Sequence, residues 1–458
     1  MVALSEVFKA YDVRGTVPDQ LDPDLCRAIG KAAARVLGAP SMVVARDMRE
    51  SGVGLSAAFA EGARSEGTAV VDIGLASTDM LYFAAGHLDM PGAMFTASHN
   101  PARYNGIKLC MAGARPIGRD TGLAAIEAVT GEILAAGGVP VGAGPLAPLK
   151  SADLLDAYAD HVRSFVDRSV LAPLVLVADT ANGMGGLVVP KVMEGLPFEV
   201  TVLFPELDGS FPNHPADPIQ PANLVALQEA VVERGADMGL AFDGDADRVF
   251  LVDEKAQPVS GSLTTALVAE AMLEKHPGAT ILYNLICSKV VPEVIAEKGG
   301  VGVRTRVGHS FIKEVMADTG AVFGGEHSGH YYYRENFRAD SGIITALLVA
   351  ELLSRDRVPL SELLLPYRRY AGSGEVNTEV ADPAAAVEAV AAHETARGLA
   401  VDRLDGLTVD HGDWWYNLRP SNTEPLLRLN VEAGDAEACR LHVAEVLALV
   451  DSLVSSPG

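Results

Sequence analysis

The feature that most limits the fold of this chain is one order of apolar segments that occurs three times. In each copy, three short apolar runs typical of buried strands alternate with two longer segments of helical period. Because this alternation is typical of βαβ units, each copy predicts an α/β domain on a βαβαβ-based parallel sheet. The repeat is much longer than that of a solenoid, so it indicates three similar domains.

The predicted elements of the first copy are the strand 41–47, helix 51–67, strand 68–74, helix 77–88 and strand 92–98. Those of the second copy are the strand 174–180, helix 186–195, strand 198–204, helix 222–235 and strand 236–242. Those of the third copy are the strand 280–286, helix 290–299, strand 301–309, helix 310–320 and strand 321–326. The glycine-rich segment 137–145 is interpreted as a linker between the first two copies.

The pattern changes at about Tyr367. Two helices and a mostly antiparallel set of strands follow, which predicts a smaller C-terminal α+β domain. Its predicted elements are strand 374–380, helix 384–397, strands 407–410, 414–418 and 426–431, and helix 436–454. Since 458 residues are too many for one core, we expect four domains. The predicted boundaries are 1–148, 149–253, 254–366 and 367–458.

A polar loop follows the third strand of every copy. These loops are 98–100, 243–248 and 326–330, and a fourth polar loop, 419–425, lies in the C-terminal domain. A structural repeat explains the strands but gives no reason for polar loops at equivalent strand ends. Because α/β proteins bind ligands at the carboxyl ends of their strands, we expect the loops to face one central cleft.

The second loop carries three carboxylates, Asp243, Asp245 and Asp247. On a straight strand they would spread over about 13 Å, too far for one ion. The small residues Gly244 and Ala246 allow the backbone to curl, so that the oxygens converge in an arrangement typical of Mg²⁺. A solvated acidic turn is the alternative.

The same loop resembles an EF-hand, because these aspartates and Glu254 fit its liganding positions. Arg248, however, stands where the sharp turn needs glycine, and strands are predicted on both sides. We therefore reject the EF-hand.

Ser98 ends a strand-like run within Thr-Ala-Ser-His-Asn-Pro. A serine beside a three-carboxylate magnesium site suggests phosphoryl transfer through a phosphoserine; alone, an Asn-Pro turn with an incidental serine would be the better interpretation. There is no G-x-S-x-G, and His99 adjoins Ser98 too closely to act as its base. Since a Walker A loop and an intact G-x-G-x-x-G are also missing, the phosphate is expected to arrive on the substrate or on the protein.

The two remaining loops offer donors and acceptors for a sugar phosphate. The loop 419–425 offers a guanidinium, two hydroxyls and an amide, which suit a phosphate dianion: Arg419, Ser421, Asn422 and Thr423. A capped surface turn is an equally good interpretation of these residues. Glu326 and Ser328 could contact sugar hydroxyls. His327 and His330 look like zinc ligands, but the sequence offers no third one.

The net charge of −24 works against binding to nucleic acid or to an anionic membrane. An anionic substrate would therefore need a local group of Arg and Lys. The first residues do not form a signal peptide, and no apolar run approaches the ~20 residues of a membrane span. Four widely spaced cysteines fit a reduced cytoplasm. No protein partner is implied.

Taken together, the motifs resemble the α-D-phosphohexomutase family, and within it the bacterial phosphomannomutase/phosphoglucomutase branch. The resemblance runs the whole length, over 11–15, 46–47, the Ser98 loop, 105–108, the Asp243 loop, 308–309, 325–330 and 419–425. It implies a four-domain enzyme in which phosphorylated Ser98 donates to a hexose phosphate. A hexose 1,6-bisphosphate, also the activator, then turns in the cleft and returns its other phosphate.

The resemblance also implies roles for individual residues. The implied catalytic set is Ser98, His99, Lys108, Arg248 and His309. The implied substrate-binding set is Tyr11, Arg14, Lys289, Glu326, Ser328, Arg419, Ser421, Asn422 and Thr423. Mg²⁺ would lie between the phosphate on Ser98 and Asp243, Asp245 and Asp247. Lys108 and His309 are both candidates for handling the hydroxyl proton.

Thr96 and the Glu326 loop favour interconversion of mannose 6-phosphate and mannose 1-phosphate, with glucose phosphates also accepted. The alternatives are phosphoglucomutase and phosphoglucosamine mutase, which usually begins its loop with Ser-Ala-Ser. Because relatives differ at the position of His327, this residue does not decide which sugar is the substrate. A sugar phosphatase and a non-catalytic sugar-phosphate binding protein remain from other classes. Release of free phosphate would identify the former, and an unphosphorylated, inert Ser98 the latter.

Overall fold

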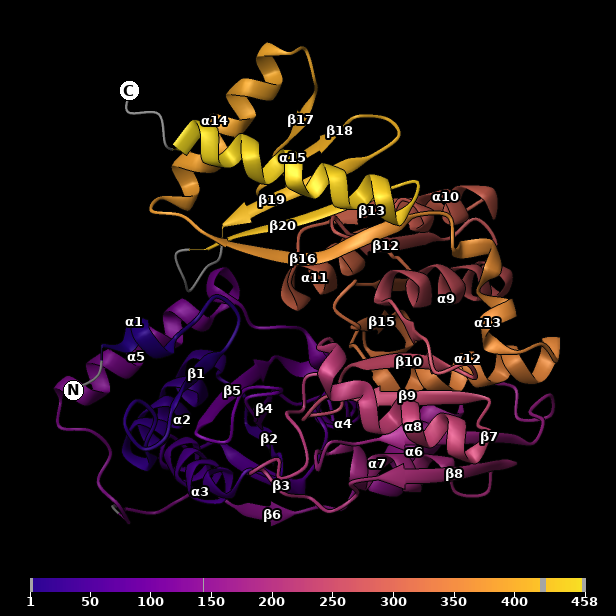
Figure 1. The fold of residues 1–458 in the computed structure, drawn as a ribbon. Helices are drawn as coiled ribbons and strands as arrows, with labels where there is room; N and C mark the ends of the chain where they lie inside the picture. The colour runs from indigo at the N-terminus through magenta and orange to yellow at the C-terminus, as the bar shows by residue number, and fades with distance from the viewer. Residues whose placement is uncertain (1–2, 143, 421–425, 455–458) are drawn as a thin grey trace. The chain divides into compact units, whose positions relative to one another are not determined.

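A computed structural model describes residues 3–142, 144–420 and 426–454 of the chain (Figure 1). The chain divides into two compact units, which are described separately. The first unit comprises Met1–Gly261, Lys313–Gly324 and Ser328–Leu363, and the second comprises Ser262–Ile312, Gly325–His327 and Leu364–Gly458. Among the described residues, no helix combines the length and apolar character needed to cross a membrane.

The first sheet has the strand order β1-β5-β4-β2-β3-β6. Its strands are β1 (Val13–Thr16), β2 (Ser41–Arg46), β3 (Ala69–Leu75), β4 (Gly92–Phe95), β5 (Tyr104–Cys110) and β6 (Leu149–Ser151). Its helices are α1 (Leu4–Val7), α2 (Pro23–Leu37), α3 (Glu50–Ser65), α4 (Thr78–His87) and α5 (Leu123–Ala135). The alternation of strands and helices predicted for the first copy is confirmed.

The first sheet contains antiparallel strands in addition to the predicted parallel ones. β2 pairs in parallel with β3 and β4, and β6 extends the sheet in parallel beyond β3. β5, however, runs antiparallel to both β4 and β1. The loop between β4 and β5 is too short for the crossover that a parallel neighbour needs, so the chain turns back beside β4. The loop that carries Ser98 is this turn.

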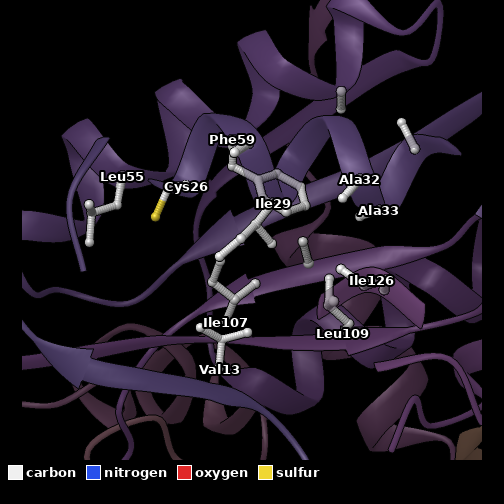
Figure 2. Close-up of a cluster of buried hydrophobic side chains, with 14 of the residues drawn as sticks. Val13, Cys26, Ile29, Ala32, Ala33, Leu55, Phe59, Ile107, Leu109 and Ile126 are labelled. Carbon is white, nitrogen blue, oxygen red and sulfur yellow. The ribbon is translucent and has the colours of Figure 1, made fainter. Parts of the chain in front are cut away.

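The core of this domain lies between the sheet and the helices α2 and α3 (Figure 2). Ile29 of α2 and Phe59 of α3 are fully buried with Val13 and Ile107 of the strands. α2 begins where Asp22 accepts a hydrogen bond from the Leu25 N–H, which satisfies an otherwise unpaired donor of the first turn. This packing gives β4 and the loop after it a rigid base.

The second sheet has the order β11-β10-β9-β7-β8. Its strands are β7 (Leu174–Asp179), β8 (Phe198–Leu203), β9 (Met238–Phe242), β10 (Val249–Asp253) and β11 (Pro258–Val259), and its helices are α6 (Leu155–Arg163), α7 (Gly185–Met193) and α8 (Val225–Arg234). β7, β8 and β9 are parallel, as the second copy predicts, whereas β10 runs antiparallel to β9. The three aspartates lie in the turn between β9 and β10.

The third copy also follows the predicted order. Its elements are α9 (Gly261–Lys275), β12 (Thr280–Asn284), α10 (Val290–Glu297), β13 (Val301–Thr305), α11 (His309–Thr319), β14 (Phe323–Gly325), β15 (Tyr331–Tyr333), α12 (Gly342–Asp356) and α13 (Leu360–Leu363). β12 and β13 pair in parallel. Every residue of α12 from Gly342 to Ser354 is buried, which makes it a core helix of the first unit.

The C-terminal sheet, in the second unit, has the order β16-β20-β19-β18-β17 and is antiparallel throughout. Its elements are β16 (Ala371–Glu379), α14 (Pro383–Ala396), β17 (Val401–Asp402), β18 (Leu407–Asp410), β19 (Trp415–Pro420), β20 (Leu426–Ala433) and α15 (Ala436–Val454). α14 and α15 cover the same face of the sheet (Figure 1) and share its apolar core. The predicted α+β domain is confirmed.

Candidate functional site

Ser98 lies in the turn after β4 with its side chain directed at the aspartate loop. Its hydroxyl donates to Asp243 Oδ2 at 2.7 Å, and its N–H donates to Thr96 Oγ1 at 2.9 Å. The Ser98 φ of 49° is left-handed, a conformation that costs a serine about 1–3 kcal/mol and persists only where the surroundings impose it. This turn ends β4 at Phe95 instead of at the predicted residue 98.

The aspartate loop gathers three buried carboxylates. Each of Asp243, Asp245 and Asp247 offers one oxygen, and these oxygens lie within 4.8 Å of one another. The Ala246 φ of 59° supplies the backbone turn that brings them together, as expected from the small residues between them. Within the described residues, Asp245 Oδ1 and Asp247 Oδ1 are buried without a hydrogen-bond partner. Two buried, unpaired anionic oxygens fit a bound cation.

Two basic residues enter this cluster from both sheets. Lys108 of β5 donates through Nζ to Asp245 Oδ2 at 2.8 Å and to Asp247 Oδ2 at 2.7 Å. Arg248 donates through Nη2 to Asp243 Oδ2 at 2.8 Å and to Ser98 Oγ at 3.1 Å. An anionic substrate needs local cations because the chain is negatively charged overall, and Lys108 and Arg248 supply them.

Burial and the neighbouring charges shift the pKa values of the groups in this cluster. Burial lowers the pKa of Lys108, but the carboxylates of Asp245 and Asp247 outweigh burial and hold that pKa well above its usual range. Burial raises the pKa of Asp243 well above its usual range. Burial also acts to raise the pKa of Asp245, but the Lys108 ammonium outweighs it and the pKa lies below its usual range. Lys108 is accordingly a fixed cation.

His99 is neutral in this setting. The Arg248 guanidinium, together with burial, holds the pKa of His99 well below its usual range. His99 Nδ1 lies 2.5 Å from Arg248 Nη2 and therefore accepts that hydrogen bond, although it also lies 3.3 Å from Ser98 Oγ. An imidazole with a low pKa whose Nδ1 is already occupied is a poor base for the serine hydroxyl.

Thr78, at the start of α4, is a residue of the site that sequence reasoning missed. Its hydroxyl donates to Asp245 Oδ2 at 2.5 Å, and its N–H donates to the Asp245 carbonyl at 3.0 Å. Thr96 Oγ1 lies 3.3 Å from the same carboxylate oxygen. Thr78 follows the carboxyl end of the parallel strand β3, and that position is the signal that could have found it.

Three more of the predicted residues lie in the first unit. Arg14 of β1 donates to Asn100 Oδ1 at 2.7 Å, so it joins the Ser98 loop, and Tyr11 precedes β1 and is half-buried. The Ser328 hydroxyl lies 3.1 Å from His330 Nδ1. His330 Nε2 lies 3.7 Å from Asp247 Oδ1, which places this histidine beside the carboxylates.

His330 has partners that the sequence did not reveal. With Asp247 and Asp340 it forms a second group whose potential ligand atoms lie within 4.8 Å of one another. Asp247 is far from His330 and Asp340 along the chain, so spacing alone did not reveal this group. His327 lies outside this group and contacts the Ser262 hydroxyl through Nδ1 at 2.9 Å.

The other predicted residues that the structure describes lie in the second unit. Lys289 donates to Asp410 Oδ1 and to the Gly412 carbonyl, each at 2.8 Å. Glu326 Oε2 accepts from Asn284 Nδ2 at 3.1 Å. Arg419 lies 3.6 Å from Glu375 and 3.8 Å from Asp405. His309 begins α11, and Ser421, Asn422 and Thr423 lie outside the described residues.

Sequence profiles of four domains match the chain in order. They are the phosphoglucomutase/phosphomannomutase alpha/beta/alpha domains I, II and III, over residues 5–136, 156–257 and 260–370, and the C-terminal domain of the same family, over 375–449. The chain belongs to the phosphoglucomutase/phosphomannomutase family. The resemblance seen in the sequence motifs is thereby confirmed, as is the α/β fold class.

Individual relatives are similar to this chain over nearly its full length. The chain is 44% identical to the phosphohexose mutases of Xanthomonas campestris pv. campestris, over 96% of this chain and 98% of that protein. It is 41% identical to a phosphomannomutase of Salmonella montevideo, over 97% and 99%. A crystal structure of a phosphoglucomutase/phosphomannomutase family protein from Burkholderia thailandensis has a TM-score of 0.88 at 32% identity, covering 99% of this chain and 98% of that one.

Proposed function

We propose that this mutase interconverts mannose 6-phosphate and mannose 1-phosphate, and that it also accepts glucose phosphates. The observation that carries the proposal is the direction of the Ser98 hydroxyl, 2.7 Å from Asp243 in the three-carboxylate loop and 3.1 Å from Arg248. A serine in this position can carry a phosphoryl group, and the nearby cations neutralise it. The mutase names of the full-length relatives support the same reaction.

In the proposed reaction the sugar hydroxyl attacks the phosphorus on Ser98 Oγ. The bond from phosphorus to Oγ breaks while the bond to the sugar oxygen forms, and the product is a hexose 1,6-bisphosphate. The intermediate turns, and a second transfer returns its other phosphate to Ser98. Arg248 and Lys108 stabilise the charge on the transferring group, because buried cations act strongly where water is excluded.

The proton of the attacking hydroxyl needs an acceptor. Lys108 Nζ already donates to the carboxylates of Asp245 and Asp247, which supports a role as a fixed cation and not as the base. We propose that a histidine, either His309 or His330, accepts this proton. The position of His330 beside Asp247 supports it, and the family resemblance supports His309.

We propose that Asp243, Asp245 and Asp247 hold Mg²⁺ together with a phosphate oxygen on Ser98. The hard oxygen donors and the unpaired Asp245 Oδ1 and Asp247 Oδ1 fit this ion. When bound, Mg²⁺ would neutralise phosphate charge during transfer.

We also propose the substrate-contacting residues that the family resemblance implies. They are Tyr11, Arg14, Lys289, Glu326, Ser328, Arg419, Ser421, Asn422 and Thr423. We also propose the domain boundaries 1–148, 149–253, 254–366 and 367–458. Four successive family profiles support the division into four domains, although the profiles of domains II and III end at residues 257 and 370, beyond the proposed boundaries. Four unpaired, buried cysteines support a cytoplasmic location.

The test is a coupled assay that compares mannose, glucose and glucosamine phosphates, with free phosphate measured in parallel. We expect mannose phosphate to react fastest, glucose phosphate to react, and no phosphate to be released. Faster reaction of glucosamine 6-phosphate would overturn the assigned sugar, and stoichiometric phosphate release would indicate a phosphatase. Intact-mass measurement should find one phosphate on the wild-type protein and none on Ser98→Ala, whose turnover should fall by orders of magnitude.

A further inference from the structure

Arg49 is a buried cation that holds the backbone of the Ser98 turn. It precedes α3 and is 1% exposed. Its Nη2 donates to the carbonyls of Ser98 at 2.9 Å and Asn100 at 2.6 Å. Its Nη1 donates to the carbonyls of Pro101 and Tyr104, each at 3.0 Å. One guanidinium therefore binds four carbonyls of the turn that joins β4 to β5.

The guanidinium is itself held from behind. Asp47, which is fully buried, accepts from Arg49 Nε at 3.2 Å and from the Arg49 N–H at 2.9 Å. The Phe211 ring of the second domain stacks near it, with its centroid 5.1 Å from Arg49 Cζ. A Cβ on Gly209 would lie 2.7 Å from Arg49 Cα, so the loop before Phe211 packs directly on this residue. The planar donor group is left little freedom to rotate.

Ser98 adopts a left-handed φ of 49°, and its peptide groups are fixed on both sides. Thr96 accepts from its N–H, and Arg49 donates to its carbonyl. Within this backbone geometry the side chain reaches Asp243 and Arg248. The direction of Oγ therefore depends on the hydrogen bonds that keep the turn in this conformation.

We propose that Arg49 is a positioning residue for phosphoryl transfer, which fixes the backbone of Ser98 without touching the substrate. The inference rests on the proposed role of Ser98 as phosphate carrier. Arg49 suits this task because its donors lie in a rigid plane, whereas a lysine ammonium offers three donors at one point. A positioning role predicts a loss in the chemical step that is larger than the loss of substrate binding.

The test is Arg49→Lys, which keeps the charge but cannot serve four carbonyls. We expect kcat to fall about 100-fold, with KM for mannose 1-phosphate changed by less than about two-fold. The single-turnover transfer of phosphate from the phosphorylated enzyme to the sugar should slow by the same factor. Arg27→Lys is the matched control: Arg27 is a similarly buried cation of the same domain, bound to Asp24 and Glu61 and not to the turn.

An Arg49→Lys protein with normal kcat, or one slowed no more than the Arg27→Lys control, would overturn the inference. If Arg49→Lys does not fold, Phe211→Leu tests the same point, because it loosens the guanidinium and leaves its hydrogen bonds. This variant should lose kcat several-fold at unchanged KM, and normal kcat would again overturn the inference. A wild-type protein without phosphate on Ser98 and without mutase activity would instead overturn the proposed function.

Discussion

Gly244 of the aspartate loop lies directly against the carbonyl of Ser98. A Cβ at this position would stand 2.4 Å from the Ser98 oxygen and 3.2 Å from its carbonyl carbon. Because the obstacle is backbone, no side chain can turn away to make room. The absence of a side chain at Gly244 therefore sets the separation between the serine and the carboxylates.

Gly244→Ala should push the two loops apart. We expect kcat to fall about 100-fold or more, since a misplacement of about 1 Å costs that much, and stability to fall by about 1–3 kcal/mol from overpacking. Steady-state kinetics and thermal unfolding measure both. Gly54→Ala is the control, because Gly54 lies on the exposed face of α3 and a Cβ there meets nothing within 4 Å; this variant should be fully active. Normal activity in Gly244→Ala would show that the loops need not touch.

The aspartate loop should bind one divalent cation. We expect EDTA to abolish activity and Mg²⁺ to restore it, with Ca²⁺ much less effective because its coordination is larger and looser. Asp247→Asn should weaken Mg²⁺ binding in calorimetry, whereas Asp318→Asn, on the exposed face of α11, should not. Equal turnover with Ca²⁺ would contradict a site that selects Mg²⁺.

Sequence reasoning worked best where the signal was local. The strand and helix order, the three aspartates and the small residues Gly244 and Ala246 all lie in continuous segments, and the fold follows them closely. It failed where the structure joins distant residues. Thr78 reaches Asp245 across two domains. Asp245 was recognised in its own loop and Thr78 follows the carboxyl end of a strand, but nothing in the sequence pairs the two residues.

Arg49 shows the same limit. It lies between two motifs that were recognised, yet its importance comes from four backbone carbonyls, and backbone acceptors leave no trace in residue types. The antiparallel strand β5 was also missed: residues 104–110 were not predicted as a strand, and apolar periodicity does not give the direction of a strand. The direction of the strands and the contacts to backbone groups could therefore not be predicted from the sequence.

Asp79 should make stability depend on pH. Its buried carboxylate accepts from Tyr158 and Ser341, each at 2.6 Å, and also from Ser77. Burial raises the pKa of Asp79 from 3.8 to about 6. Since the folded state holds this proton more tightly than the unfolded state, the associated stability, about 3 kcal/mol, is present below pH 3.8 and lost as pH rises through 6.

Asp79→Asn removes this titration. The thermal midpoint of the wild-type protein, minus that of the variant, should increase as pH falls from about 7.5 to about 4. Any constant offset from altered hydrogen bonds cancels in this comparison. A difference that does not change with pH would mean that Asp79 keeps an ordinary pKa in the folded protein.

Arg419 should bind the phosphate that is not being transferred, whichever end of the sugar carries it. Losing a charge-assisted pair in a site closed to water costs about 2–5 kcal/mol of binding free energy. Arg419→Ala should therefore weaken binding of the sugar 1-phosphate and of the sugar 6-phosphate to the same extent. Glu375 lies 3.6 Å from both Arg419 and Arg428, so it would compete with a bound phosphate for these cations. Glu375→Gln should therefore strengthen binding of both isomers, by at most about 1 kcal/mol at a partly exposed pair. Measuring KM and kcat in both directions tests the two variants together: an effect confined to one isomer would mean that Arg419 serves a single orientation of the sugar.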